Sequence, residues 1–133
     1  MADRQAAGED RAPARGTAVL GRYGEDLAAE HLVATGAVLL HRNWRCREGE
    51  IDIVAREPDG TVVFCEVKTR SGTGFGAPAE SVGPVKARRI RVVACRWLQD
   101  NRPPGTRELR FDVIAVVRRR GYAPELVHLR DAF

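Results

Sequence analysis

The spacing of apolar residues divides the chain into two helical and five extended segments. Between residues 17 and 35, apolar side chains recur every three or four positions, which predicts an amphipathic helix that ends near Gly36. A second segment with this spacing begins near Pro84, a residue suited to the first helical turn, and ends near Asp100. Its predicted inner stripe consists of Ile90, Val93, Ala94 and Trp97. Strands are predicted over residues 37–46, 49–55, 62–69, 108–117 and 125–129.

The order of these segments is helix, three strands, helix and two strands. It favours an α/β fold with a mixed sheet of about five strands flanked by helices. Residues 57–60 (EPDG) suit a hairpin turn between the second and third strands, because proline fixes a negative φ and glycine accepts a positive one. In the first strand, Val38, Leu40 and Trp44 alternate with polar residues and are expected to face inward.

Length and composition limit the class of protein. With 133 residues the chain suffices for one domain, expected over residues 17–133 after a disordered tail of residues 1–16 that lacks periodicity. No apolar run approaches the roughly 18 residues of a membrane span, and the N-terminus offers no secretion signal. The three cysteines, Cys46, Cys65 and Cys95, show no CxxC spacing and fit a reducing compartment. We therefore expect a soluble cytoplasmic protein with no membrane partner.

Positive charge is concentrated in one part of the chain. The net charge is +4, yet residues 69–107 contain eight basic and two acidic side chains, which leaves the remainder net negative. A protein that binds a phosphate backbone needs such a segment, and Arg70, Lys86 and Arg89 are its candidate nucleic-acid-binding residues. The alternative, a helix surface that is merely solvated, stays open. Residues 69–78 are rich in glycine but lack the order of a nucleotide-binding loop, so we expect a mobile segment that contacts substrate.

Two carboxylates and a lysine interrupt strands that are otherwise apolar. Asp52 lies in the second predicted strand, and Glu66 and Lys68 lie in the third. Because side chains alternate along a strand, Glu66 and Lys68 share one face. The opposite face would carry Cys65, Val67 and Thr69. The hairpin places Asp52 beside Glu66, and burying two carboxylates is costly unless they have a partner such as a divalent cation held by oxygen ligands.

The first helix carries one acidic residue with two open interpretations. Glu25 lies beside small and apolar neighbours at the flank of the inner face, so it could reach a site. Alternatively, it is exposed and paired with Arg22 or with water. Gly21 and Gly24 each lower helix stability by about 1 kcal/mol relative to alanine, which indicates close packing or a close ligand.

Three further strand residues could belong either to a site or to the structural core. Asp112 lies in an apolar strand and is either a member of the site or a structural hydrogen-bond acceptor. His41 has no His or Cys at ligand spacing, which is typical of a structural histidine. Trp44 could stack on a base, although an aromatic residue in a strand is more often part of the core.

A resemblance follows from these motifs. Asp52 and, further along, Glu66-Val67-Lys68 match the (D/E)…(D/E)xK signature of restriction-endonuclease-like nucleases, the PD-(D/E)xK proteins. Further matching stretches are GRYGE (residues 21–25), GEID (49–52), EVKT (66–69) and RFDV (110–113). With these, the chain closely resembles the YraN-like family of small bacterial proteins, which are similar to archaeal Holliday-junction resolvases. The resemblance covers about residues 17–130.

The resemblance implies a catalytic set of Glu25, Asp52, Glu66 and Lys68. Asp52 and Glu66, helped by the Val67 carbonyl, would bind Mg²⁺ or Mn²⁺ as the cofactor. Lys68 would position the attacking water or help to deprotonate it. Glu25 would match the carboxylate that the first helix supplies in this group of nucleases.

The motif and the basic segment together favour a metal-dependent endonuclease that hydrolyses phosphodiester bonds in branched or structured DNA during repair or recombination. Two alternatives stay open. One is a nucleic-acid-binding module of the same fold with weak or lost catalysis. The other is an RNA-processing nuclease, because phosphate contacts do not distinguish DNA from RNA. Resolution of a junction needs two active sites, so we expect a homodimer by analogy.

Overall fold

The computed structural model describes residues 15–71 and 82–133. In chain order it contains α2 (Arg15–Ala34), β1 (Val38–Cys46), β2 (Gly49–Arg56), β3 (Val62–Ser71), α3 (Pro84–Asn101), β4 (Leu109–Arg118) and β5 (Glu125–Leu129). This is the predicted order, with ends that differ by one or two residues at most. The predicted tail lies outside the described residues except for its last two, which open α2, and the predicted mobile segment lies outside them beyond Ser71.

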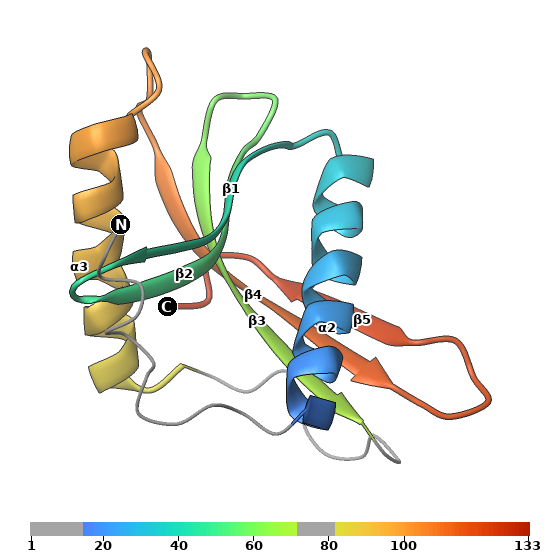
Figure 1. The fold of residues 1–133 in the computed structure, drawn as a ribbon. Coiled ribbons are helices and arrows are strands. Elements are labelled where there is room, and N and C mark those ends of the chain that lie inside the picture. The colour runs from blue at the N-terminus through green and yellow to red at the C-terminus, as the bar shows by residue number, and fades with distance from the viewer. Residues whose placement is uncertain (1–14, 72–81) are drawn as a thin grey trace.

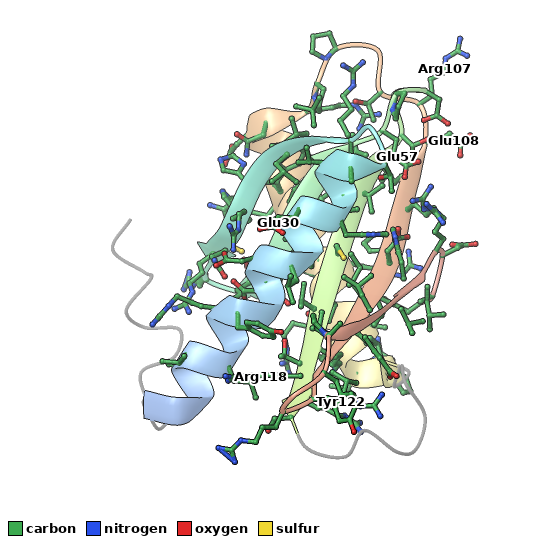
Figure 2. All side chains as sticks on the ribbon, turned by 90° about the vertical axis from the view of Figure 1, so that its right-hand side faces the viewer. Glu30, Glu57, Arg107, Glu108, Arg118 and Tyr122 are labelled. Carbon is green, nitrogen blue, oxygen red and sulfur yellow. The ribbon has the colours of Figure 1, made fainter. Side chains whose placement is uncertain are left out.

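The strands form one mixed sheet in the order β1-β2-β3-β4-β5, which confirms the predicted fold class. β3 and β4 run parallel, whereas the other neighbouring strands are antiparallel. A parallel pair needs a crossover connection, and α3 lies in the one between β3 and β4. The two helices cover opposite faces of the sheet (Figure 1). Figure 2 looks onto the face that α2 covers.

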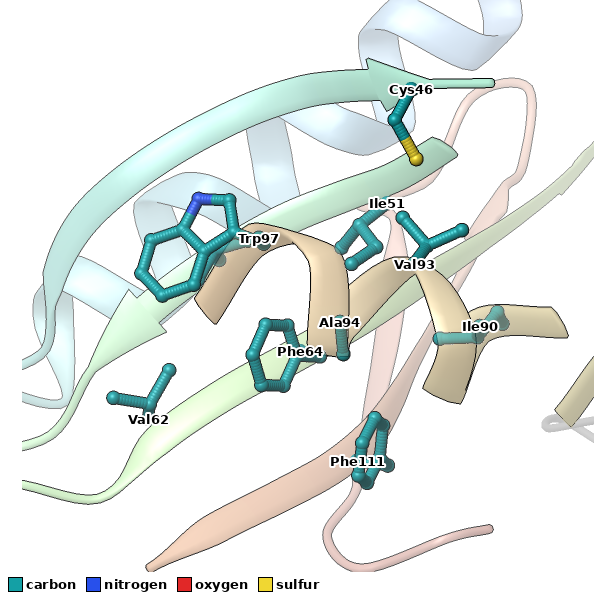
Figure 3. Close-up of a cluster of buried hydrophobic side chains, with 10 residues drawn as sticks. Cys46, Ile51, Val62, Phe64, Ile90, Val93, Ala94, Trp97 and Phe111 are labelled. Atoms are coloured by element: carbon teal, nitrogen blue, oxygen red, sulfur yellow. The ribbon is translucent and has the colours of Figure 1, made fainter. Parts of the chain in front are cut away.

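The face under α3 is closed by aromatic and aliphatic side chains (Figure 3). The predicted inner stripe of α3 is confirmed, since Ile90, Val93, Ala94 and Trp97 are all buried. The Trp97 ring meets Phe64 of β3 edge-on, with 5.7 Å between the ring centroids. Each such aromatic pair adds about 0.5–1.5 kcal/mol beyond the area it buries, which holds α3 against the sheet. His41 belongs to this cluster as a structural residue, because its Nδ1 accepts a hydrogen bond of 2.8 Å from Trp97 Nε1.

The first strand does not alternate as predicted. Leu40 and Trp44 pack against the core under α3, as expected, and Trp44 thus has a core role. The prediction for Val38 was wrong, because its side chain is 61% exposed. A register shift between Leu39 and His41, of the kind a β-bulge produces, separates Val38 from the face that Leu40 and Trp44 share.

The other face packs against α2 through both small and large apolar side chains. Ala28 and Leu32 are buried there, and Cys65 and Val67 of β3 point to this face, as predicted. At Gly24 the helix lies directly against β3. A Cβ atom at this position would lie 2.8 Å from the Cβ of Thr69 and closer still to its hydroxyl group, whereas one at Gly21 would meet nothing within 4 Å. Close packing therefore explains Gly24 and leaves Gly21 unexplained.

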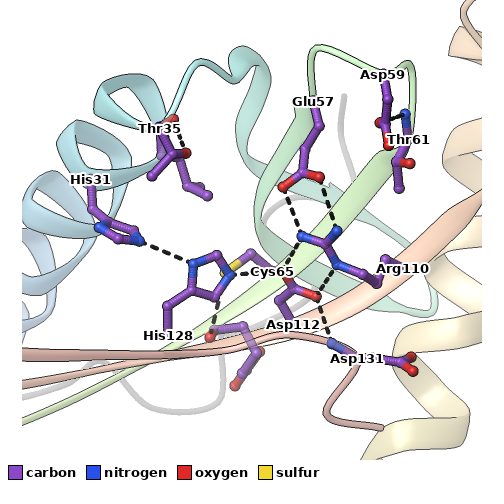
Figure 4. Close-up of polar contacts among 12 residues, drawn as sticks. His31, Thr35, Glu57, Asp59, Thr61, Cys65, Arg110, Asp112, His128 and Asp131 are labelled. Carbon is purple, nitrogen blue, oxygen red and sulfur yellow. Dashed lines mark hydrogen bonds and ion pairs between the residues drawn. The ribbon is translucent and has the colours of Figure 1, made fainter.

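A polar network joins β4, β5 and the turn between β2 and β3 (Figure 4). Asp112 is fully buried and accepts hydrogen bonds of 2.9 Å from two guanidinium nitrogens of Arg110. It also accepts one from the Asp131 backbone amide at 3.0 Å, and His128 Nε2 lies 2.7 Å from its Oδ2. An ionised carboxylate only accepts, so His128 donates in this contact. Arg110 in turn binds both carboxylate oxygens of Glu57, at 2.9 and 2.8 Å.

These contacts keep Asp112 ionised. Burial alone would raise its pKa, but the hydrogen bonds from His128 and Arg110 outweigh burial and hold the pKa at about 2. Asp112 pairs in register with Cys65, so it faces α2 and points away from the Glu66 side of the sheet. Of the two roles left open by the sequence, the network gives Asp112 that of a structural acceptor.

The three cysteines are unpaired thiols, as the sequence predicts. Cys46 and Cys65 are buried, Cys95 is exposed, and all three are free. Burial raises the pKa of the Cys65 thiol, which keeps it protonated and unreactive. Among the described residues, no helix is both long enough and apolar enough to cross a membrane.

The two glycines of α2 should respond in opposite ways to alanine. We expect Gly24→Ala to lower the free energy of unfolding by about 1–3 kcal/mol, because the new methyl group meets the β-branched Thr69 side chain, which cannot easily turn away. Gly21→Ala should raise it by about 0.5–1 kcal/mol, because the position is open and alanine favours the helix. Urea unfolding of both variants measures this, and shifts of the same sign would contradict it.

The Asp112 network should make stability depend on pH. We expect Asp112→Asn to lower the free energy of unfolding at neutral pH by about 2–4 kcal/mol. Since the folded pKa is about 2 and the ordinary value is 3.8, this stabilisation is complete above the ordinary value and is lost as the pH falls toward 2. Urea unfolding from pH 6 to pH 3 should therefore show the difference between wild type and variant narrowing.

A surface carboxylate provides the control for this measurement. Glu125→Gln removes the exposed partner of Arg119 and should change the free energy of unfolding by less than about 0.5 kcal/mol at any of these pH values. A difference between wild type and Asp112→Asn that stays constant with pH would rule out an electrostatic origin.

Candidate functional site

Asp52 and Glu66 are neighbours where the pairing of β2 with β3 ends. The ladder ends with Ile53 opposite Cys65, and Asp52 and Glu66 are the next residues on the two strands. Glu66 is buried and Asp52 is half-buried. Asp52 Oδ2 accepts a hydrogen bond of 2.7 Å from the backbone amide of Val67, which fixes its orientation. The hairpin thus brings together the two carboxylates that the motif singled out.

The two carboxylates repel each other. Burial, and next the charge of Glu66, raise the pKa of Asp52 to about 8. The hydrogen bond from the Val67 amide lowers this pKa but does not offset the increase. The charges of Glu25 and Glu50 add to the increase. Holding both Asp52 and Glu66 ionised is therefore unfavourable unless a cation lies between or beside them.

Two lysines approach the same oxygen of Glu66. Lys86 Nζ, from the first turn of α3, lies 2.6 Å from Glu66 Oε2, and Lys68 Nζ lies 3.9 Å from it. The second contact confirms that Glu66 and Lys68 share one face of β3. Within residues 15–71 and 82–133, both lysines of the site pair with Glu66, and no ion pair reaches Asp52. Positive charge is thus concentrated on one of the two carboxylates.

The donor atoms at this position suit a hard divalent cation. In the part of the chain that the structure describes, no three or more His, Cys, Asp or Glu side chains form a ready metal cluster. Mg²⁺ does not need one, because it commonly binds one or two carboxylates and completes its octahedron with water and substrate phosphate. The amide of Val67 points to β2, and the N–H and C=O of a strand residue point the same way, so its carbonyl faces the same side. Asp52, Glu66 and Val67 therefore fit the predicted ligand set.

Glu25 has partners that the sequence did not indicate. Its Oε1 accepts a hydrogen bond of 3.1 Å from Asn43 and lies 4.0 Å from Arg42, both on β1. Burial raises the pKa of Glu25, whose side chain is only 18% exposed. It thus reaches inward to the edge of the acidic site, instead of pairing with Arg22. Asn43 has a φ of 54°, a conformation that asparagine tolerates better than most residues, and an asparagine within a strand was the available signal.

The three predicted nucleic-acid-binding residues lie at different positions around this site. Lys86 binds Glu66, as described. Arg89 is exposed one turn further along α3, and its aliphatic carbons would contact a Cβ atom at Gly49, at the start of β2. Arg70 is half-buried near the end of β3, two residues beyond Lys68. Basic side chains therefore continue from the acidic site along α3 and β3.

Comparison with known proteins gives the family. Residues 24–116, which span every candidate catalytic and metal-binding residue, match the family described as "Uncharacterised protein family UPF0102". A UPF0102 protein of Parafrankia sp. (strain EAN1pec) is 56% identical over 115 residues, which cover 86% of this chain and 95% of the relative. One of Acidothermus cellulolyticus is 50% identical over 124 residues, covering 86% and 92%, and one of Streptomyces griseus is 52% identical over 111, covering 84% and 92%. The chain therefore belongs to the UPF0102 family, the YraN-like proteins of restriction-endonuclease-like fold.

Proposed function

We propose that this protein is a divalent-metal-dependent endonuclease that hydrolyses phosphodiester bonds in branched or structured DNA. The proposal rests on the adjacent carboxylates Asp52 and Glu66. Glu66 pairs with Lys86, whereas Asp52 accepts a hydrogen bond from a backbone amide and has a raised pKa. Such a pair of carboxylates can hold a divalent metal ion that also binds a substrate phosphate. Repair and recombination are the processes in which such DNA arises.

Each residue of the site has a definite task in this proposal. Asp52 and Glu66 hold the cation from two strands, and the Val67 amide keeps the Asp52 carboxylate in place. When bound, Mg²⁺ or Mn²⁺ supplies Lewis acidity toward the phosphodiester and a bound water of lowered pKa. Lys68, on the same face as Glu66, positions the attacking water or accepts its proton at Nζ. Glu25 adds negative charge at the edge of the site and helps to hold the outer water molecules.

The nucleic acid would lie across the first turns of α3. Arg89 is exposed there and can contact phosphate without leaving its place above Gly49. Arg70 extends this basic surface from the side of β3. Two copies of the chain would then cut the two strands of a junction, which is the reason to propose a homodimer.

One observation favours a second candidate function. Lys86 already neutralises Glu66, and Asn43 already satisfies Glu25, so the site can persist without a metal ion. A nucleic-acid-binding module with weak or lost catalysis, acting on DNA or RNA, would have the same basic surface and would need no cation.

We expect the purified protein with Mg²⁺ or Mn²⁺ to nick four-way junctions or flapped DNA. Asp52→Asn and Lys68→Ala should each lower the cleavage rate by about 100-fold or more, because each removes a group that acts on the reacting atoms. Binding of the same DNA, measured by fluorescence anisotropy in EDTA, where no metal ion is bound, should change by less than about threefold. Asp100→Asn, which removes an exposed carboxylate elsewhere on α3, should leave both quantities unchanged.

The same assays separate the two functions. The binding module would be favoured if no metal ion supports cleavage of any DNA or RNA structure, while binding persists and weakens steeply with salt. Cleavage that survives Asp52→Asn would mean that the metal lies elsewhere.

A further inference from the structure

Lys86 occupies the oxygen that a divalent cation would need. Its ammonium group lies 2.6 Å from Glu66 Oε2, closer than the 3.9 Å of Lys68. In the sequence, Lys86 stood out only as a member of the basic segment. The short contact gives it a second property, which is to supply positive charge to the carboxylate pair when no metal ion is bound.

This ion pair is built to be reversible. The side chain of Lys86 is 45% exposed, whereas that of Glu66 is only 11% exposed, so the lysine reaches into the site from solvent. Ion pairs of such exposure contribute little net stability, because water solvates the free lysine nearly as well. The flexible stem of lysine and its position in the first turn of α3 allow the ammonium group to move outward without any change in the backbone.

A divalent cation and the Lys86 ammonium group cannot both bind Glu66 Oε2 favourably. A cation at about 2.1 Å from that oxygen would lie less than about 5 Å from Nζ, where the two positive charges repel each other. Lys68 lies farther from the oxygen and is attached two residues along the same strand, so it can stay in place.

We propose that Lys86 is a displaceable counter-ion of Glu66, which gives up the carboxylate to the divalent cation and then binds a phosphate of the nucleic acid. The proposal rests on the metal site of the proposed function. It makes metal binding and phosphate binding cooperative, because each favours the outward position of the same side chain. Metal binding thus becomes a condition for full contact with nucleic acid, and the free protein keeps its buried carboxylate neutralised.

The first test measures metal binding by the protein alone. Free Mn²⁺ is determined by electron paramagnetic resonance for wild type, Lys86→Met and Arg89→Met. We expect Lys86→Met to bind Mn²⁺ about fivefold more tightly, because the competing ammonium group is gone. Arg89→Met removes one positive charge from the same helix without touching Glu66 and should change the affinity by less than about twofold. Methionine keeps a straight chain at an exposed helical position, so both variants should fold.

The second test measures DNA affinity with and without Ca²⁺, using fluorescence anisotropy of a labelled four-way junction. Lys86→Met should weaken binding about fivefold or more in Ca²⁺. In EDTA, where Lys86 is engaged by Glu66, the same change should weaken binding by less than about twofold. Arg89→Met should weaken binding to the same extent under both conditions.

The outcomes distinguish this inference from the function on which it rests. If Mn²⁺ binds, and Asp52→Asn abolishes that binding, but Lys86→Met and wild type have equal affinities, the counter-ion role is wrong and the metal site stands. If Mn²⁺ does not bind to wild type or to Lys86→Met, the metal site itself is wrong. Equal losses of DNA affinity for Lys86→Met in Ca²⁺ and in EDTA would make Lys86 an ordinary phosphate contact and overturn the inference.

Discussion

The repulsion between Asp52 and Glu66 is the constraint that organises the polar end of this molecule. The register of the β2–β3 hairpin makes the two carboxylates neighbours, and burial removes much of the water that would separate their charges. The result is an Asp52 pKa near 8 and two lysines that converge on Glu66. Positive charge at this point therefore offsets the repulsion, and the ammonium groups of the two lysines supply it.

The two faces of the sheet contribute to this arrangement in different ways. Under α3 the core is rich in aromatic side chains, and the long side chain of Lys86 extends from the first turn of this helix to Glu66. Under α2 the contact includes small residues beside Leu32, and at Gly24 the helix comes so close that it meets Thr69. Glu25 is the next residue, so this close approach is also what carries its carboxylate to the edge of the acidic site.

Features of this fold that depend on local periodicity could be predicted from the sequence. The buried stripe of α3 and the shared face of Glu66 and Lys68 follow from repeats of 3.6 and 2 residues, and the hairpin turn follows from its local proline and glycine. Features that depend on contacts between distant segments could not. The bulge that exposes Val38 leaves no local signal, and the lysine that neutralises Glu66 comes from a helix twenty residues away.

Asp52 and Asp112 show why burial of a carboxylate does not by itself identify a site. Both interrupt apolar strands, and this local pattern alone does not tell them apart. Asp112 is surrounded by donors from Arg110, His128 and the backbone, and its pKa falls to about 2. Asp52 has one backbone donor and a second carboxylate beside it, and its pKa rises. A carboxylate whose donors are complete stabilises the fold, whereas one that lacks positive charge is ready to bind a cation.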